Sequence, residues 1–100
     1  MENNKVWSYI SISCKAGYIQ SGEFSVEKSI KEGRAKLVII AMDASDNTKK
    51  NFNDSCTFYK VPIVFFGTKE ELGHRIGKEL RSSIAVTDEK MAEVIRRLFE

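Results

Sequence analysis

Histidine and cysteine are the side chains best suited to catalysis or metal binding, and this sequence has few of them. Its 100 residues include one histidine, His74, and two cysteines, Cys14 and Cys56. His74 lies between glycines in a predicted short helix, where we expect it on the surface. Both cysteines fall on predicted apolar helix faces, which favours small core residues over nucleophiles. A zinc site would also need several carboxylate ligands. We therefore expect no catalytic site, no metal and no cofactor.

The residues around Phe24 indicate binding rather than catalysis. Lys28 and Lys31 follow Phe24 by four and seven residues, so the three side chains share one helical face. Val26 and Ile30 point the other way, toward a core. Phe24 is thus a large aromatic residue outside the buried face and beside two cations. The alternative interpretation is that Phe24 packs onto the first helix and that the lysines are simply solvated.

The start of the same helix supplies backbone donors. Ser21 is a candidate cap, and Gly22 would let a partner approach the helix end closely. The free N–H groups of Gly22, Glu23, Phe24 and Ser25, together with the helix dipole, favour an anion such as phosphate. An aromatic ring, cations and an open helix end are together suited to contacting RNA.

A second candidate contact lies near the end of the chain. Arg81, Ser82 and Ser83 form a predicted turn before a strand, and Lys78 and Arg75 precede them at helical spacing. Hydroxyl groups and cations on a loop suit contacts with phosphate and sugar.

Regularly alternating elements must position these residues. Helices are predicted over about 5–16, 21–33, 48–59, from Thr68 to about 76, and from 87 to about 99, and strands over 18–20, 36–41, 63–66 and 83–86. Thr68 and Glu71 fit a capping box. Strand 36–41 is apolar on both faces, and strand 63–66 is also expected to be buried. In the last helix the predicted buried face includes Val94. This alternation predicts an α/β fold with a largely parallel or mixed sheet between helical layers.

Length and charge limit the class of protein. One hundred residues with 42% hydrophobic content suit a single domain over 1–100. The longest apolar stretch is short, and the first residues do not resemble a secretory signal, so we expect a cytoplasmic protein that does not enter the membrane. The net charge of +2 gives little overall attraction to nucleic acid, so RNA binding would depend on a local patch.

Several motifs, in this order, resemble a known family. They are Ser21-Gly22-Glu23, Lys28-Ser29-Ile30, the run from Gly33 to Ala41, the run from Asp43 to Lys50, Val61-Pro62, the run from Leu72 to Lys78, and Ile84-Ala85-Val86. Together they are similar to the superfamily of large-subunit ribosomal proteins seven-Ae and thirty-e, and most of all to its small bacterial YlxQ-type members. The resemblance extends from about Lys5 to Leu98.

The resemblance implies a three-layer α/β/α sandwich with a mixed sheet of about four strands. It also implies binding to structured RNA, with ribosomal RNA among the candidates, and an association with the ribosome and with ribosome-associated proteins. Many members bind a kink-turn, a sharply bent internal loop. By position, Gly22 and Lys28 match residues that meet the RNA, and the stretch 80–83 matches the loop over a flipped-out nucleotide. Phe24-Ser25 replaces the polar pair with which kink-turn binders contact G·A pairs.

A protein-interaction or regulatory module on the same fold is the alternative. Phe24 and Trp7 would then be aromatic anchors of a protein interface. Salt separates the two hypotheses, because phosphate contacts weaken steeply with salt whereas an apolar interface does not.

Overall fold

The computed structural model describes residues 3–100, in which five helices alternate with four strands. In chain order the elements are α1 (Asn3–Lys15), β1 (Ile19–Ser21), α2 (Glu23–Lys31), β2 (Leu37–Ile40), α3 (Asp46–Tyr59), β3 (Ile63–Phe65), α4 (Lys69–Arg75), β4 (Ser83–Val86) and α5 (Glu89–Arg97). Each lies within a few residues of an element predicted from the sequence.

The strands form one mixed sheet in the order β1-β4-β2-β3. β2 runs parallel to β3, with Val38 opposite Ile63, whereas β4 runs antiparallel to both of its neighbours. The two central strands, β2 and β4, are buried along their whole length. The predicted four-stranded mixed sheet is confirmed.

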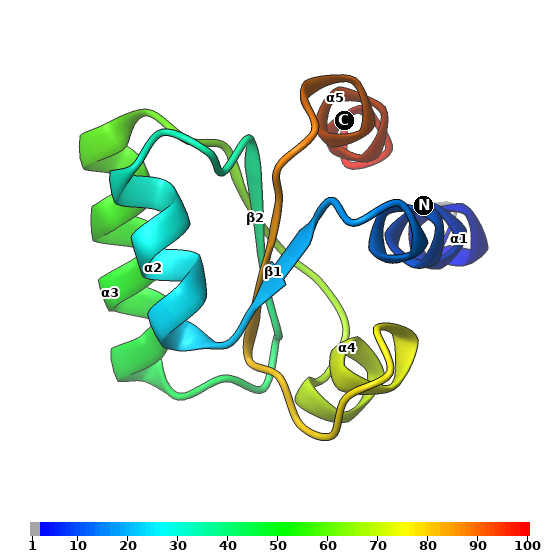
Figure 1. Cartoon of the computed structure of the whole chain (residues 1–100). Coiled ribbons are helices and arrows are strands. Elements are labelled where there is room, and N and C mark those ends of the chain that lie inside the picture. The colour runs from blue at the N-terminus through cyan, green and yellow to red at the C-terminus, as the bar shows by residue number, and fades with distance from the viewer. Residues whose placement is uncertain (1–2) are drawn as a thin grey trace.

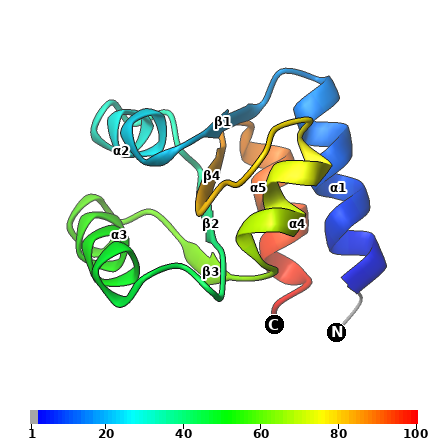
Figure 2. The ribbon, with the colours of Figure 1, turned by 90° about the horizontal axis from the view of Figure 1, so that it is seen from below.

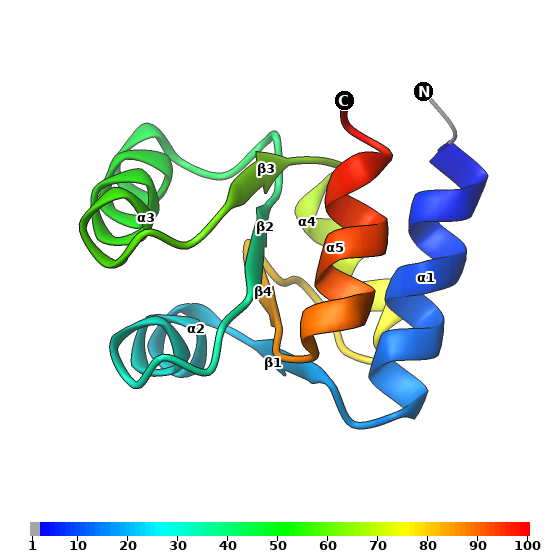
Figure 3. The ribbon, with the colours of Figure 1, turned by 90° about the horizontal axis from the view of Figure 1, so that it is seen from above.

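Helices cover both faces of this sheet. α2 and α3 lie side by side on one face, and α1, α4 and α5 lie on the other, which gives the expected three layers (Figure 1). Both α2 and α3 begin at the lower end in that view and end at the upper end. The view from above shows the ends of α1 and α5 nearest the chain termini lying next to each other (Figure 3).

Local sequence signals fix where several helices begin. The Thr68 hydroxyl accepts from the Glu71 N–H and the Glu71 carboxylate accepts from the Thr68 N–H, so the predicted capping box is present. Ser45 caps α3 and Asp88 caps α5, each by accepting an N–H from the first turn. These short-range bonds explain why the helix starts could be predicted from the sequence.

Two predicted buried positions are exposed. Phe65, at the end of β3, is 40% exposed because β3 is the edge strand of the sheet rather than an inner one. Val94 is 39% exposed because α5 faces the core with Ala92, Ile95 and the half-buried Met91.

Candidate functional site

The first turn of α2 begins without a side-chain cap. Its N-cap residue is Gly22, whose φ of 91° suits glycine far better than other residues. The first helical hydrogen bond runs from the Val26 N–H to the Gly22 carbonyl, at 3.0 Å. The amides of Glu23, Phe24 and Ser25 therefore have no carbonyl four residues earlier in the helix to accept from them. This end of α2 offers N–H donors to an anion.

Gly22 also joins α2 to the middle of the sheet. Its N–H donates to the carbonyl of Ser83, the first residue of β4, at 3.2 Å, so the prediction that this N–H is free for an anion is wrong. A Cβ on Gly22 would meet no atom within 4 Å, so the space in front of it is open. The expectation that Ser21 caps the helix is wrong. Ser21 ends β1, and its hydroxyl accepts a 3.3 Å hydrogen bond from Nε of Arg81.

Phe24 lies on the outer face of α2. Its side chain is 80% exposed, and Lys28 and Lys31 are exposed as well, whereas Val26 and Ile30 are buried. The alternative in which Phe24 packs onto the first helix is wrong, because α1 lies on the opposite face of the sheet (Figure 1). An aromatic ring and two cations are therefore available to a partner on one helical face.

A groove between α2 and α3 adjoins the Phe24 ring. Phe24, Glu27 and Lys31 line it from α2, and the α3 side consists of Asn51, Phe52, Asp54 and Ser55. The Ser55 hydroxyl donates to the Glu27 carboxylate at 2.7 Å and so links the two helices. Phe24 thus stands at the side of a groove whose lining mixes aromatic, charged and polar side chains.

The loop before β4 lies at the same end of the sheet as the start of α2, the end toward the viewer in Figure 2. Arg81 and Ser82 are half-buried. The Arg81 N–H donates to the Lys69 carbonyl at 3.0 Å, and the Ala41 N–H donates to the Ser82 carbonyl at 2.9 Å. The structure therefore brings the two predicted contact regions together.

The prediction that the Ser83 hydroxyl contacts a partner is wrong. The Ser83 side chain is fully buried at the start of β4. Helices cover both faces of the sheet (Figure 1), so a side chain of the central strand β4 is enclosed on whichever face it lies. Ser83 contributes its carbonyl to Gly22, and of the three predicted contact residues Arg81 and Ser82 stay partly accessible.

Gly73 determines the course of this loop. A Cβ on Gly73 would overlap the carbonyl oxygen of Glu79, so only glycine lets the chain return so closely over α4. The Gly73 carbonyl in turn accepts the N–H of Lys78 at 2.8 Å. The glycine explains how the segment leading to Arg81 is held against the body of the protein.

The Glu23 carboxylate connects three elements, a role that the sequence analysis missed. One of its oxygens, Oε2, accepts from the Thr48 hydroxyl at 3.4 Å and from the Ser82 hydroxyl at 3.3 Å. Thr48 in turn accepts a 2.9 Å hydrogen bond from Ser45, the cap of α3. Glu23 therefore joins the starts of α2 and α3 to the loop before β4.

Exposed apolar side chains complete this end of the molecule. Leu80, next to Arg81, is 58% exposed, and Met42 is 63% exposed. Met42 follows Ala41, whose N–H is bonded to the Ser82 carbonyl, and Leu80 belongs to the loop itself. In the sequence Met42 ends an apolar run. Only the fold shows that the end of this run lies beside the loop, through the bond between Ala41 and Ser82.

The remaining candidates have structural roles. Cys56 is buried, and this burial, with a smaller effect of the Glu27 carboxylate, raises its pKa to about 12, which makes it a poor nucleophile. Cys14 is half-buried, with its Sγ 3.7 Å from the Ile76 carbonyl. Trp7 is only 7% exposed and lies beneath the Arg75 guanidinium, so it cannot anchor a protein interface as the alternative required.

Two further observations apply to the described residues. Within residues 3–100, no group of three or more histidine, cysteine, aspartate or glutamate side chains is placed to hold a metal ion. In the same part of the chain, no helix combines the length and apolar character needed to cross a membrane.

Comparison with known proteins shows similarity along nearly the whole chain. Residues 4–96 match the ribosomal protein L7Ae/L30e/S12e/Gadd45 family. The chain is 41% identical to RNA-binding protein YlxQ of Bacillus subtilis, over 91% of each sequence. It is 31% identical to large ribosomal subunit protein eL8 of Thermoplasma acidophilum, over 86% of this chain and 72% of that protein. A solved structure of a protein of unknown function from Bacillus halodurans superposes with a TM-score of 0.90 at 33% identity, over 94% of this chain and 95% of that one.

Proposed function

The chain belongs to the ribosomal protein L7Ae/L30e/S12e/Gadd45 family, and we propose that it is a non-enzymatic RNA-binding protein. Structured RNA would lie across the start of α2 and the loop before β4. The names of the Bacillus and Thermoplasma relatives, an RNA-binding protein and a ribosomal protein, support this assignment. Residues 1–100 would act as one RNA-binding domain.

The observation that carries the proposal is the exposure of Phe24 beside free backbone donors. Its ring is 80% exposed at a helix end whose first amides have no helical acceptor. Lys28 lies one turn further along the same face, and Arg81, whose Nε donates to Ser21, lies in the loop before β4. Aromatic stacking, amide donors and cations would together hold a bent RNA strand.

Phe24 and Ser25 point to a particular mode of recognition. Phenylalanine has no donor or acceptor for a base edge, so Phe24 would stack on an unpaired base. Leu80, exposed in the loop before β4, would add an apolar contact to such a base. The preferred target would be an internal loop of the kink-turn type that presents an unstacked nucleotide, recognised through its shape and backbone.

The names of the relatives also support a proposal for which RNA is the natural target. Because the Thermoplasma relative is a large ribosomal subunit protein, we propose ribosomal RNA as the natural target, with ribosomal proteins as neighbours. The protein would then act in the cytoplasm, where ribosomes work.

Fluorescence polarisation tests the proposal directly. Two labelled RNAs of equal length, one with a kink-turn and one a plain duplex, are titrated at low and moderate salt. We expect tighter binding to the kink-turn RNA, with an affinity that falls steeply as salt rises. Weak, salt-insensitive binding to both RNAs would reject RNA binding and favour the protein-interaction module.

A further inference from the structure

A second concave surface lies at the opposite end of α2 from the proposed site. It is a cleft of about 460 Å³, within the size range of small-ligand sites. Its floor is apolar and includes Ile30, Ala35 and Val61, and its walls come from the ends of α2 and α3 and from α5. Figure 3 views the molecule from this end.

Cations dominate the polar lining of this cleft. Lys31, Lys36, Lys60 and Arg96 line it, against two carboxylates, Glu89 and Glu93. Glu93 is already paired with Arg97, outside the lining, at 2.7 Å. The lining therefore carries a net excess of positive charge, which favours an anionic ligand.

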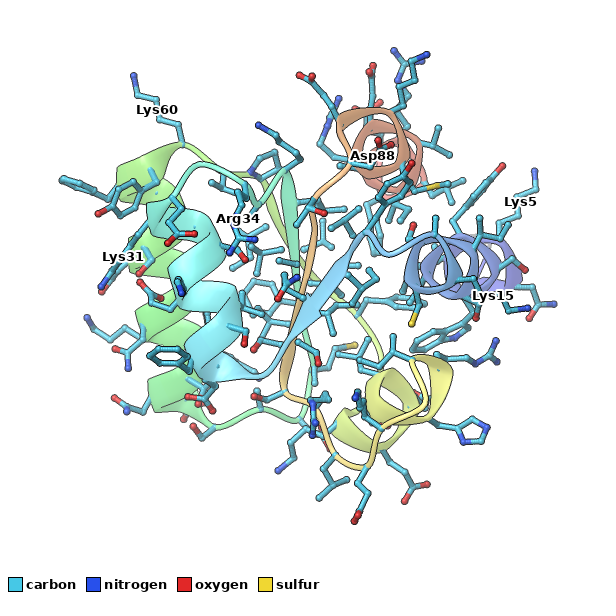
Figure 4. All side chains as sticks on the ribbon, viewed as in Figure 1. Lys5, Lys15, Lys31, Arg34, Lys60 and Asp88 are labelled. Carbon is cyan, nitrogen blue, oxygen red and sulfur yellow. The ribbon has the colours of Figure 1, made fainter. Side chains whose placement is uncertain are left out.

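The cations of the cleft differ in their availability. Arg96 is paired with Glu100 at 2.8 Å, and Lys36 donates from Nζ to the Gly33 carbonyl at 3.1 Å. Among residues 3–100, neither Lys31 nor Lys60 takes part in an ion pair. Figure 4 shows both of these lysines on the α2–α3 side of the molecule, with Lys60 extending outward at the end of α3.

An aromatic ring accompanies these charges. Tyr59, the last residue of α3, lines the cleft and is 41% exposed. Lys60 follows it in a left-handed conformation, with φ of 60°, and Pro62 lies close by in the same lining. A flat ring beside several cations is the combination used by surfaces that bind single-stranded nucleic acid.

Lys31 makes the cleft continuous with the first site. It lines both this cleft and the groove beside Phe24. Phe24 and Lys31 are seven residues apart in one helix, a rise of about 10 Å. A strand that leaves the start of α2 along its outer face would pass Lys28 and then reach the cleft.

We propose that this cleft is a second RNA contact, which takes the phosphodiester backbone and one base of the strand leaving the first site. The cations of Lys31, Lys36 and Lys60 would meet phosphates, and Tyr59 would stack on the base. The inference rests on the proposed function, because it extends the path of the same RNA. It adds a preference for RNAs with a single-stranded flank.

A double variant tests the contribution of the cleft. Lys36→Gln with Lys60→Gln removes two charges but keeps side chains of similar length. Lys5→Gln with Lys15→Gln, on α1 across the sheet, is the matched control (Figure 4). Polarisation titrations then use a kink-turn RNA with a single-stranded flank and the same RNA with the flank removed.

The expected result is specific to the flanked RNA. Losing two phosphate contacts lowers the slope of log affinity against log salt by about 1.4. The loss of RNA affinity between 50 and 200 mM salt should therefore be about sevenfold smaller for the cleft variant than for the wild type. The trimmed RNA should bind the cleft variant and the wild type equally, and the α1 control should behave like the wild type. Equal slopes for the cleft variant and the wild type on the flanked RNA would contradict the proposal that the cleft contacts RNA.

Nuclear magnetic resonance gives an answer that does not depend on the first site. Hexauridylate is titrated into labelled wild-type protein, and we expect amide shifts over residues 33–36 and 59–62 that shrink in the cleft variant. Shifts confined to residues 22–25 and 80–82, or no shifts at all, would contradict the proposal that the cleft contacts RNA. Binding of structured RNA in the polarisation experiment decides the proposed function separately, and equal unfolding temperatures show that the variants are folded.

Discussion

The hydroxyl of Ser82 donates a 3.3 Å hydrogen bond to the carboxylate of Glu23, which joins the loop before β4 to the first turn of α2 across 59 positions of sequence. The N–H of Gly22 reaches the same strand through the Ser83 carbonyl. These two regions are far apart in the sequence. The contacts hold them next to each other in a fixed arrangement. The proposed RNA surface depends on that arrangement more than on any single side chain.

Replacing Phe24 tests the stacking contact. Phe24→Ala should weaken binding to the kink-turn RNA about tenfold, because a stacked aromatic contributes about 1–3 kcal/mol. Stability should change by less than about 0.5 kcal/mol, since the ring is 80% exposed. Polarisation titration and chemical unfolding measure the two effects.

The matched control for Phe24 is Phe58→Ala. Phe58 is 77% exposed but lies near the end of α3, away from the start of α2. On an RNA without a single-stranded flank it should bind like the wild type. Equal affinities for the Phe24 variant and the Phe58 variant would remove Phe24 from the contact.

Neutralising Glu23 separates its structural role from its charge. Glu23→Gln keeps an oxygen that can accept from Thr48 and Ser82 but removes a negative charge from the helix end where phosphate would bind. RNA affinity should rise about two- to fivefold, the size of a surface charge interaction. Weaker binding would instead show that the RNA needs the carboxylate itself. Titration at two salt concentrations measures the change.

Gly73 should be required for the loop before β4. Gly73→Ala places a Cβ on the Glu79 carbonyl, so the loop must move, at a cost of about 1–3 kcal/mol in unfolding free energy. RNA binding should weaken as well, because Arg81 and Ser82 follow this segment. Gly77→Asn is the control, since a Cβ there meets no atom within 4 Å and asparagine tolerates a positive φ. Comparable stability for the two variants would contradict the proposed role of Gly73.

Burial of Cys56 predicts a dependence of stability on pH. The folded thiol keeps its proton up to about pH 12, whereas the unfolded thiol loses it above about pH 9. The folded state binds more protons in this window, so stability is full below pH 9 and falls by about 1.4 kcal/mol per pH unit above it. Urea unfolding of the wild type and of Cys56→Ala between pH 8 and 10.5 isolates this effect, because the other groups titrate in both proteins. Parallel curves would show that Cys56 does not titrate as described.

Local signals in the sequence predicted much of the fold. The arrangement of the site was harder to predict, because it depends on contacts between residues that are far apart in the sequence. The capping box of Thr68 and the apolar run of β2 depend on near neighbours, and both were predicted correctly. The burial of the Ser83 side chain depends on the helices that cover both faces of β4 (Figure 1), which no local pattern reveals. The link from Glu23 to Ser82 likewise requires the closed fold, so the sequence suggested two contact regions but not how they meet.

Photo-crosslinking identifies directly which residues touch the RNA. A kink-turn RNA with 4-thiouridine at its unpaired position is bound to the protein and irradiated, and the attached residue is found by mass spectrometry. We expect attachment to Phe24 or within residues 80–82, and its loss from residue 24 in the Phe24→Ala variant. Attachment only to α1 or α5, on the other face of the sheet, would contradict the proposed RNA surface.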